Sequence, residues 1–358
     1  MRDPRAALPR VCLLAAAETS PGVLYGLYDV LSTVGAIYPE MTMGKVGDPL
    51  LDVKIVAATA QPFRCYGNVI VEPHASLANL ADTDVAVVCD MYLPIDASPR
   101  GRYPAEISWL KHAHDNGAIV ASVCSGSLIL AEAGLLDGLE AAGHWAYRQM
   151  FREHYPDVKL RTGLVLSLAG ERDRIVTAGG VSSWQDLALY LIARLCGPEH
   201  AIRTAKIHIL SEHLDGQLPF AVARPRKQDA DAVIAECQAW IAENYASANP
   251  VARMAERAGL VPRTFARRFL AATGYKPMDY VHALRVEEAK QLLETDDSTI
   301  EEIGEAVGYE DPTSFRRLFK RKAGVTPAAY RRKFAKIGAT VMHAASIARR
   351  RSAPGLRL

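Results

Sequence analysis

The sequence predicts an α/β domain followed by an all-α domain that carries two helix-turn-helix units. Apolar runs typical of buried strands alternate with helical stretches from residue 10 to about residue 197. One of these runs, 118–123, passes through a turn of small residues into a helix. Near the C-terminal end, two segments repeat the plan helix, glycine, helix. A chain of 358 residues has room for two or three domains, each with its own core.

The first domain is predicted from strands and helices that alternate. Runs rich in β-branched residues indicate strands at 11–17, 53–59, 85–89, 118–123 and 175–178. Helical stretches are found at 23–34, 105–116, 125–136, 146–154 and 184–196. This order predicts a mostly parallel sheet flanked by helices, with hairpin or edge pieces at 69–71 and 164–168. A helix is expected over 200–220, and the Pro- and charge-bearing stretch 221–229 is typical of a linker.

Cys124 stands at the most informative turn of this domain. The segment AIVASVCSGSLILAEAGLLDG runs from an apolar strand through Cys124 and Ser125 into a helix. Such a sharp turn, a nucleophile elbow, exposes one side chain in front of backbone N–H groups. The positive helix N-terminus is expected to lower the pKa of the Cys124 thiol and to favour thiolate. His144, within Gly-His-Trp, is expected beside it, so the candidate pocket residues are Cys124, Ser125 and His144.

The first helix-turn-helix unit begins near Val251. Apolar residues recur from there at helical spacing, behind Asn249 as the N-cap. Gly259 ends this helix in the left-handed conformation that glycine tolerates. The helix that follows buries two phenylalanines and leaves Arg263 and Arg267 one turn apart on its outer side.

The second unit follows the same plan. Ser298 and Glu301 fit a capping box at its start, and Gly308 ends its first helix. Asp311 is expected to cap the second helix. The outer side of that helix carries Thr313, Ser314, Arg316, Arg317, Lys320 and Arg321. Two units joined by one long helix, roughly 278–294, suit two successive major grooves about 34 Å apart on one face of DNA.

Charge is divided unevenly along the chain. The formal net charge is +2, yet residues 251–358 carry about +9 and the remainder about −7. A basic end on an acidic body favours a nucleic-acid-binding module joined to a module of another kind. Solvated charged faces are the plain alternative, and the helix-turn-helix pattern argues against it.

Cysteines, apolar runs and histidines exclude several other classes. Six scattered cysteines without a C-x-x-C pair favour reduced thiols in an intracellular protein. The run 11–17 is too short for a membrane span, and no other run approaches the roughly 18 apolar residues that a span needs. A soluble, cytoplasmic protein without membrane contact is therefore expected. His112 and His114 have no matching carboxylate or cysteine that would complete a ligand set, so no metal is expected, and no cofactor is expected either.

The two helix-turn-helix units resemble the DNA-binding domain of the AraC/XylS family of transcription regulators. The motifs are GLVPRTFARRFLAATGYKPMDYVHALRVEEAKQLLE and TIEEIGEAVGYEDPTSFRRLFKRKAGVTPAAYRRKF. The resemblance implies a sequence-specific regulator on double-stranded DNA, with RNA polymerase as a candidate partner. It implies that the DNA-facing residues are Arg263, Thr264, Ala266, Arg267, Thr313, Ser314, Arg316 and Arg317, and Lys320 projects from the same helix. Which of them read bases and which touch phosphates stays open, and Arg268 and Arg321 are equally phosphate contacts or solvated residues.

The first domain resembles the class I glutamine-amidotransferase-like superfamily in its ThiJ/PfpI branch. The motifs are SVCSGSLILAEAGLLDG, GHW and IVTAGGVSSWQDLALYLI. Fusion of this domain to an AraC-type domain is a known regulator architecture, and it implies a homodimer and a small-molecule effector that shifts the population of DNA-competent dimers. The expected parts are the ThiJ/PfpI-like domain at 10–200, a helical connector and linker at 201–230, the DNA-binding domain at 231–334 and a basic tail at 335–358.

The elbow pocket has several alternative roles. Family enzymes pair the cysteine with a histidine and with an acid on the helix after the first strand, but here that position falls at or beside Val23 and Leu24. Glu18 lies earlier, and its spacing does not fit. Without the acid, proton transfer around Cys124 is handicapped, so a ligand-binding or dimerising remnant is favoured and no enzyme is expected. The alternatives are a thiol-based redox sensor, a cysteine-dependent hydrolase or hydratase, and an inert buried thiol.

Overall fold

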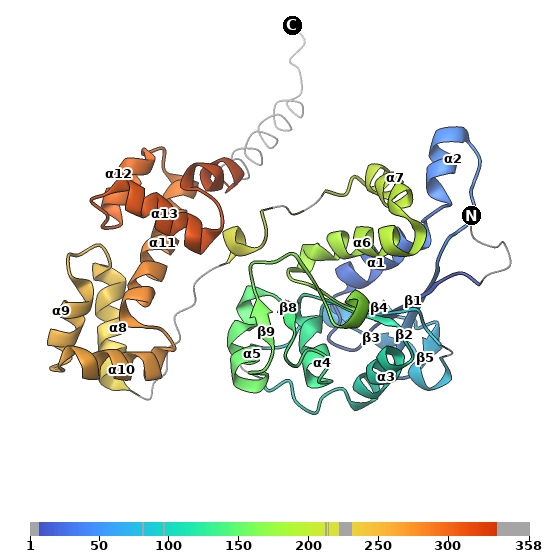
Figure 1. The fold of residues 1–358 in the computed structure, drawn as a ribbon, viewed down its shortest axis with the longest axis horizontal. Helices are drawn as coiled ribbons and strands as arrows, with labels where there is room; N and C mark the ends of the chain where they lie inside the picture. The colour runs from blue at the N-terminus through green and yellow to red at the C-terminus, as the bar shows by residue number, and fades with distance from the viewer. Residues whose placement is uncertain are drawn as a thin grey trace, which may run out of the picture. The chain divides into compact units, whose positions relative to one another are not determined.

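The computed structural model describes residues 7–80, 82–95, 97–211, 213, 215–221 and 231–334. The chain divides into two compact units, Met1–Gln217 and Leu218–Leu358 (Figure 1). This division falls inside the stretch 201–230 that was expected to be a separate connector. The greater part of the expected linker, 222–230, and the expected basic tail, 335–358, lie outside the described residues.

The first unit is built on a seven-stranded sheet in the order β10-β11-β7-β6-β1-β2-β5. Its strands pair in parallel except at the edge, where β10 is antiparallel to β11, which confirms the expected mostly parallel sheet. The strands are β1 (Arg10–Leu14), β2 (Asp52–Ala57), β5 (Ala75–Ser76), β6 (Val85–Val88), β7 (Ile119–Val123), β10 (Leu166–Ala169) and β11 (Ile175–Ala178). Two smaller sheets join β3 (Phe63–Arg64) to β4 (Ile70–Val71) and β8 (Glu140–Ala142) to β9 (Lys159–Arg161).

Helices cover both faces of the seven-stranded sheet. Val11 and Leu13 of β1 belong to an apolar cluster with residues of two helices, while Cys12 and Leu14 belong to the cluster on the other face. The strands therefore show continuous apolar runs, because side chains on both faces are buried. The first cluster includes α1 (Pro21–Ser32) and α6 (Trp184–Cys196), and the second includes α3 (Pro104–Asp115), α4 (Ser127–Glu132) and α5 (Arg148–His154). The remaining helices of this unit are α2 (Ile37–Met43) and α7 (Pro198–His208).

The segment after α7 is not helical to residue 220, contrary to the expectation. Helix α7 ends where Ile209 adopts the left-handed conformation, with φ 53°. His213 then donates from its backbone N to Asp186 of α6 at 3.1 Å, and its ring Nδ1 lies 2.7 Å from the same carboxylate. The buried side chain of Gln217 donates from Nε2 to the carbonyl of Leu164 at 2.7 Å. Polar anchors on the first unit thus replace the helical hydrogen bonds.

The second unit is all helical, as expected, and contains two helix-turn-helix pairs. Helices α9 and α10 form the first pair, α12 and α13 form the second, and α11 runs between them (Figure 1). The helices are α8 (Ala232–Asn244), α9 (Pro250–Arg257), α10 (Pro262–Thr273), α11 (Pro277–Thr295), α12 (Ile300–Ala306) and α13 (Pro312–Ala323), and residues 327–334 are helical as well. Among the described residues, no helix has the length and apolarity that a membrane crossing requires.

The caps of these helices agree with the sequence except at two places. Asp311 accepts hydrogen bonds from the backbone N of Thr313 at 3.0 Å and of Ser314 at 2.9 Å, as expected for an N-cap. The capping box of α12 lies one residue later than expected, because it is Thr299 and Glu302 that exchange hydrogen bonds. Ser298 binds Asp296 instead. Asn249 does precede α9, but its backbone is left-handed and its side chain makes no capping hydrogen bond.

Candidate nucleic-acid interface and elbow site

Helix α10 turns a basic side to solvent. Its two phenylalanines, Phe265 and Phe269, are fully buried and fix which side faces the core. Arg263 and Arg267 are exposed on the other side, next to half-buried Thr264 and Ala266. In the part of the chain that the structure describes, neither Arg263 nor Arg267 forms an ion pair. Both guanidinium groups are therefore available to an anionic partner.

Arg268 on the same helix has a different role from its two neighbours. Its Nε and Nη2 donate to the carboxylate of Asp231 at 3.0 and 2.8 Å. Asp231 is the N-cap of α8, and its pKa is lowered chiefly by the hydrogen bond from Arg268. Arg268 thus joins α10 to α8. This structural role is neither of the two that the sequence left open for it, a phosphate contact or a solvated residue.

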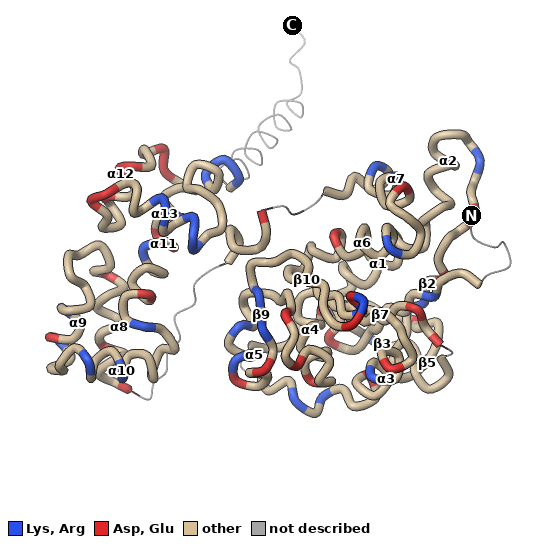
Figure 2. The backbone as a smooth tube through the Cα atoms, viewed as in Figure 1, with Lys and Arg blue, Asp and Glu red and all other residues tan. Residues whose placement is uncertain are grey.

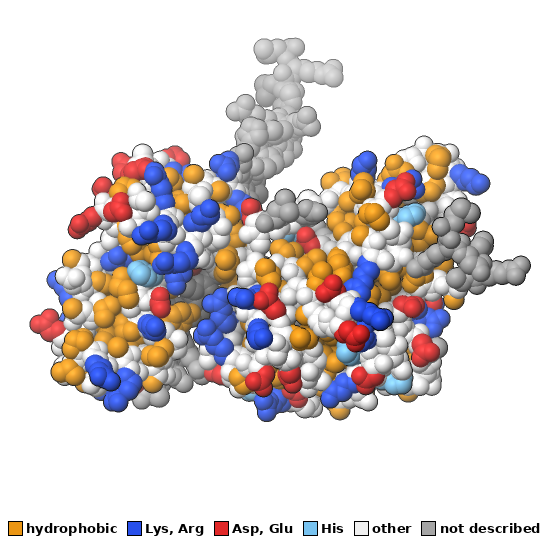
Figure 3. All heavy atoms as spheres, viewed as in Figure 1, with side chains coloured by type: hydrophobic (Ala, Val, Ile, Leu, Met, Phe, Trp, Pro, Cys, Tyr) orange, Lys and Arg blue, Asp and Glu red, His pale blue; other side chains and the backbone are white. Residues whose placement is uncertain are grey.

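Helix α13 presents the second basic side. Phe315 and Phe319 are fully buried. The residues predicted to face outward are exposed or half-buried, and they are Thr313, Ser314, Arg316, Arg317 and Lys320. Arg316 forms an ion pair with Glu301 of α12. Lys and Arg residues are seen on α10 and α13, acidic residues gather on α12 (Figure 2), and basic side chains lie over the α13 end of this unit (Figure 3).

Cys124 occupies the elbow between β7 and α4. Its φ of 54° is left-handed, a conformation that costs a non-glycine residue about 1–3 kcal/mol. Glycine is needed at position 126, two residues later, because a methyl group there would lie 2.6 Å from the carbonyl oxygen of Val88 in the neighbouring strand. The Ser127 hydroxyl donates to the carbonyl of Cys124 at 2.7 Å and closes the turn. The sharp strand-to-helix turn is present as expected, but the Cys124 side chain is buried, contrary to the expected exposure.

Asp90 is the site residue that sequence reasoning missed. Val88 of β6 pairs with Ser122 of β7, so continuing this parallel register places Asp90 beside Cys124. The Ser125 hydroxyl donates to Asp90 Oδ1 at 2.9 Å, and the Ser125 backbone N lies 3.4 Å from the same oxygen. The signal was present in the sequence, since a carboxylate directly follows the buried run 85–89.

The pKa of the Cys124 thiol is raised, contrary to the lowered pKa that the helix start was expected to give it. Burial raises its pKa well above the ordinary value, and the charge and hydrogen bonding of Asp90 raise it further. The backbone hydrogen bond from Ser125 acts in the opposite direction but is the smallest effect. The Asp90 carboxylate also accepts from the backbone N–H of Ser125, which would otherwise stabilise a thiolate. The helix start therefore lowers the Cys124 pKa only a little.

His144 lies near this site but does not complete a catalytic pair with Cys124. Its Nδ1 accepts a hydrogen bond from the backbone N of Ala146 at 3.2 Å, and its ring lies against Trp145 with centroids 5.0 Å apart and the planes tilted by 32°. Burial lowers its pKa, and the charge of Asp90 opposes this effect. Among the described residues, no hydrogen bond joins His144 to Cys124.

The helix after β1, α1, holds apolar side chains at the two positions where the resemblance places the acid of the family enzymes. Val23 and Leu24 are buried in the apolar core. Glu18 lies 3.5 Å from Arg102, and its charge raises the pKa of Tyr103 beyond the larger effect of burial. It therefore serves another cluster. Within the described ranges, no group of three or more His, Cys, Asp or Glu residues is arranged to hold a metal ion.

Comparisons with protein families match both units. Residues 29–194 match the DJ-1/PfpI family, and residues 254–333 match a helix-turn-helix domain. The HTH-type transcriptional regulator CdhR of Pseudomonas aeruginosa is 27% identical over 84% of this chain and 87% of its own length. The HTH-type transcriptional regulator GlxA of Rhizobium meliloti is 30% identical over 61% of this chain and 66% of its own.

Two solved structures are similar to parts of the chain. An AraC family transcriptional regulator from Pseudomonas putida has 20% identity and a TM-score of 0.46, covering 56% of this chain and 99% of that one. The DNA-binding domain of the global transcriptional factor AdpA, solved with a target DNA, has 38% identity and a TM-score of 0.27 over 28% of this chain and 91% of that one.

Proposed function

We propose that this protein is a transcription regulator that binds specific sequences of double-stranded DNA. The chain joins a DJ-1/PfpI domain to an AraC-type helix-turn-helix domain, and its homologues are HTH-type transcriptional regulators. The observation that carries the proposal is the pair of helices α10 and α13, each oriented by buried phenylalanines and each with an exposed basic side. The residues proposed to face DNA are Arg263, Thr264, Ala266 and Arg267 on α10, and Thr313, Ser314, Arg316, Arg317 and Lys320 on α13.

Within this set, Arg267 and Arg317 are the best candidates for base readout. An arginine without an internal partner can donate two hydrogen bonds to O6 and N7 of guanine at no internal cost. Arg316 must first leave Glu301, so a phosphate contact suits it better. Thr313 and Ser314 lie in the first turn of α13, where Asp311 accepts hydrogen bonds from their backbone N–H groups, so we propose that only their side chains reach bases or phosphates.

The test is selection of bound fragments from sheared genomic DNA, followed by gel shifts at one fixed salt concentration. Arg267→Ala and Arg317→Ala should each weaken binding to the selected site by about 1–3 kcal/mol per lost bidentate contact. Arg257→Ala is the matched control. It removes an exposed arginine of α9 that pairs with Glu236 of α8, and neither residue lies on a recognition helix. Equal losses of affinity in all three variants, or no loss of affinity in any of them, would refute the proposed contacts of α10 and α13 with DNA.

The first unit is proposed to bind a small effector and to dimerise, without catalysing a reaction. Cys124, Ser125 and His144, together with Asp90, would line the effector site. Support comes from the raised pKa of the Cys124 thiol and from the lack of a Cys124–His144 hydrogen bond in the described residues, both of which disfavour nucleophilic catalysis. Such a regulator would act in the cytoplasm, with RNA polymerase as a candidate partner.

Cys124→Ser and wild type should enrich the same DNA motif if thiol chemistry is not needed for binding. Enrichment lost only in the variant would instead favour the redox-sensor alternative. A protein that remains a monomer in sedimentation across working concentrations would remove dimerisation from the proposal. Turnover through a covalent Cys124 adduct would restore the hydrolase or hydratase.

A further inference from the structure

Helix α11 belongs to two separate apolar cores. Tyr280 and Val281, near its start, pack with residues of α8, α9 and α10. Val286 and Leu293, further along, pack with residues of α12 and α13. The two clusters have no residue in common. Long helices curve readily, so this packing alone leaves the angle between the two helix-turn-helix pairs weakly determined.

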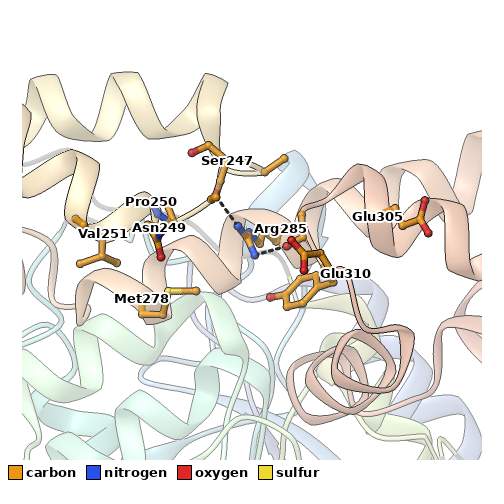
Figure 4. Close-up of a pocket in the computed structure, with 13 residues that line it drawn as sticks. Ser247, Asn249, Pro250, Val251, Met278, Arg285, Glu305 and Glu310 are labelled. Carbon is orange, nitrogen blue, oxygen red and sulfur yellow. Dashed lines mark hydrogen bonds between the residues drawn. The ribbon is translucent and has the colours of Figure 1, made fainter.

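Arg285 lies on α11 between these clusters and is only 6% exposed. Its Nε donates to the carbonyl of Tyr245 at 2.7 Å and its Nη2 to the carbonyl of Ser247 at 3.2 Å, both in the turn between α8 and α9. Its Nη1 donates to the carbonyl of Gly308 at 2.8 Å, in the turn between α12 and α13. The guanidinium carbon lies 5.0 Å from the ring centroid of Tyr309. One buried cation therefore joins the turn that leads into the first pair to the turn inside the second pair (Figure 4).

Burial makes this arrangement hard to replace. A guanidinium removed from water needs partners for its N–H groups, and hydrogen bonds from a charged donor are roughly twice as strong as neutral ones. Three carbonyls in fixed directions accept from Arg285, so a movement of either pair would break at least one of these bonds. Lysine has a single ammonium group and cannot hold three carbonyls in the planar directions of a guanidinium.

The turns that Arg285 joins also touch each other directly. Gly308 has φ 87°, and a methyl group there would lie 2.6 Å from the carbonyl oxygen of Ala246 and 2.9 Å from Nη2 of Arg285. The turn before α13 thus packs against the turn before α9 with no side chain between them. Both turns line a groove of about 670 Å³ that also includes Asn249 and Met278 (Figure 4).

We propose that Arg285 is a positioning residue for DNA recognition: it fixes the distance and angle between α10 and α13, and so sets the spacing between the two base sequences that the protein reads. The inference rests on the DNA-binding function proposed above. Arg285 itself reads no base, because its donors bind carbonyls inside the protein. One base pair added between the two sequences turns the second by about 34–36° around the DNA axis, which a rigid protein cannot follow.

The experiment uses the full chain and a library of random double-stranded DNA. Wild type, Arg285→Lys and Lys290→Met are each taken through selection, and the separation between the two enriched sequence blocks is measured. Lys290 is the matched control, because it is a cation 5% exposed on the same helix. Its contacts, Ala221, Glu287 and the ring of Tyr330, do not include the first pair. Gel shifts then compare the best site with sites one base pair longer and shorter.

Wild type and Lys290→Met should select one separation and lose at least tenfold in affinity on the altered sites. Arg285→Lys should select several separations, bind the best site about tenfold more weakly and lose less than threefold on the altered sites. A uniform loss of affinity with the wild-type dependence on spacing would overturn the inference. If circular dichroism shows that Arg285→Lys does not fold, Tyr309→Leu, which removes the ring beside the guanidinium, decides by the same comparison. Wild type that enriches no sequence would instead refute the proposed function.

Discussion

Replacement of Phe315 by alanine is expected to loosen the second helix-turn-helix pair and to leave the first intact. The Phe315 ring is fully buried, with its centroid 5.8 Å from that of Tyr309 and 5.9 Å from that of Phe319. A Phe→Ala change in a core costs about 3–5 kcal/mol, from the lost transfer free energy and the cavity left behind. Because the two apolar clusters share no residue, this loss falls on α12 and α13.

Hydrogen exchange of the full chain, followed by mass spectrometry, measures each pair separately. At about 1.4 kcal/mol per tenfold change, the loss should speed exchange of the amides in α12 and α13 that open together by about a hundredfold to a few thousandfold. The amides of α9 and α10 should keep their wild-type rates. Phe269→Ala, equally buried in the other cluster, is the mirror control and should reverse the pattern.

Acceleration of both pairs to the same extent by either substitution would refute this reasoning. It would mean that α11 transmits the loss and that the two pairs unfold as one cooperative unit. The magnitude is a second check, because a change below tenfold in α12 and α13 would contradict full burial of Phe315.

Two further changes test the elbow. Asp90→Asn removes the anion that helps to raise the Cys124 pKa, so alkylation by iodoacetamide at one fixed pH should be faster than in wild type, and an equal rate would contradict the charge effect. Gly126→Ala should cost about 1–3 kcal/mol and lower the melting temperature, because its methyl group would lie 2.6 Å from the carbonyl oxygen of Val88. Gly22→Ala, with no atom within 4 Å, is its control, and similar melting temperatures for the two variants would refute the packing argument.

Features set by local periodicity could be predicted from the sequence. The strand at 175–178 and the helix at 184–196 were predicted at the bounds observed for β11 and α6. The two helix-turn-helix pairs were equally clear, since Gly259 and Gly308 end helices in the conformation that glycine favours. Each of these signals lies within about a dozen residues of chain, and burial in the fold did not override it.

Features that depend on contacts between distant segments were missed. Asp90 reaches Cys124 only because β6 and β7 are neighbours in the sheet, which strand order alone reveals. An arginine on a helix usually lies at the surface, so the sequence gives no sign that Arg285 is buried. Only the fold brings three carbonyls to it. Helix α2 buries no residue, so it has no apolar stripe by which it could be recognised.

The continuity of α11 has a consequence for insertions and deletions. Each residue added to an α-helix advances the chain by about 1.5 Å and turns it by about 100°. Since the two ends of α11 lie in different cores, one inserted residue would swing the second recognition helix out of the groove that it should enter. Substitutions of exposed residues on α10 and α13 leave that geometry unchanged. On the proposed docking, new DNA specificities can therefore arise by exchanging side chains on the two recognition helices. Insertions or deletions in α11 would instead disrupt DNA binding.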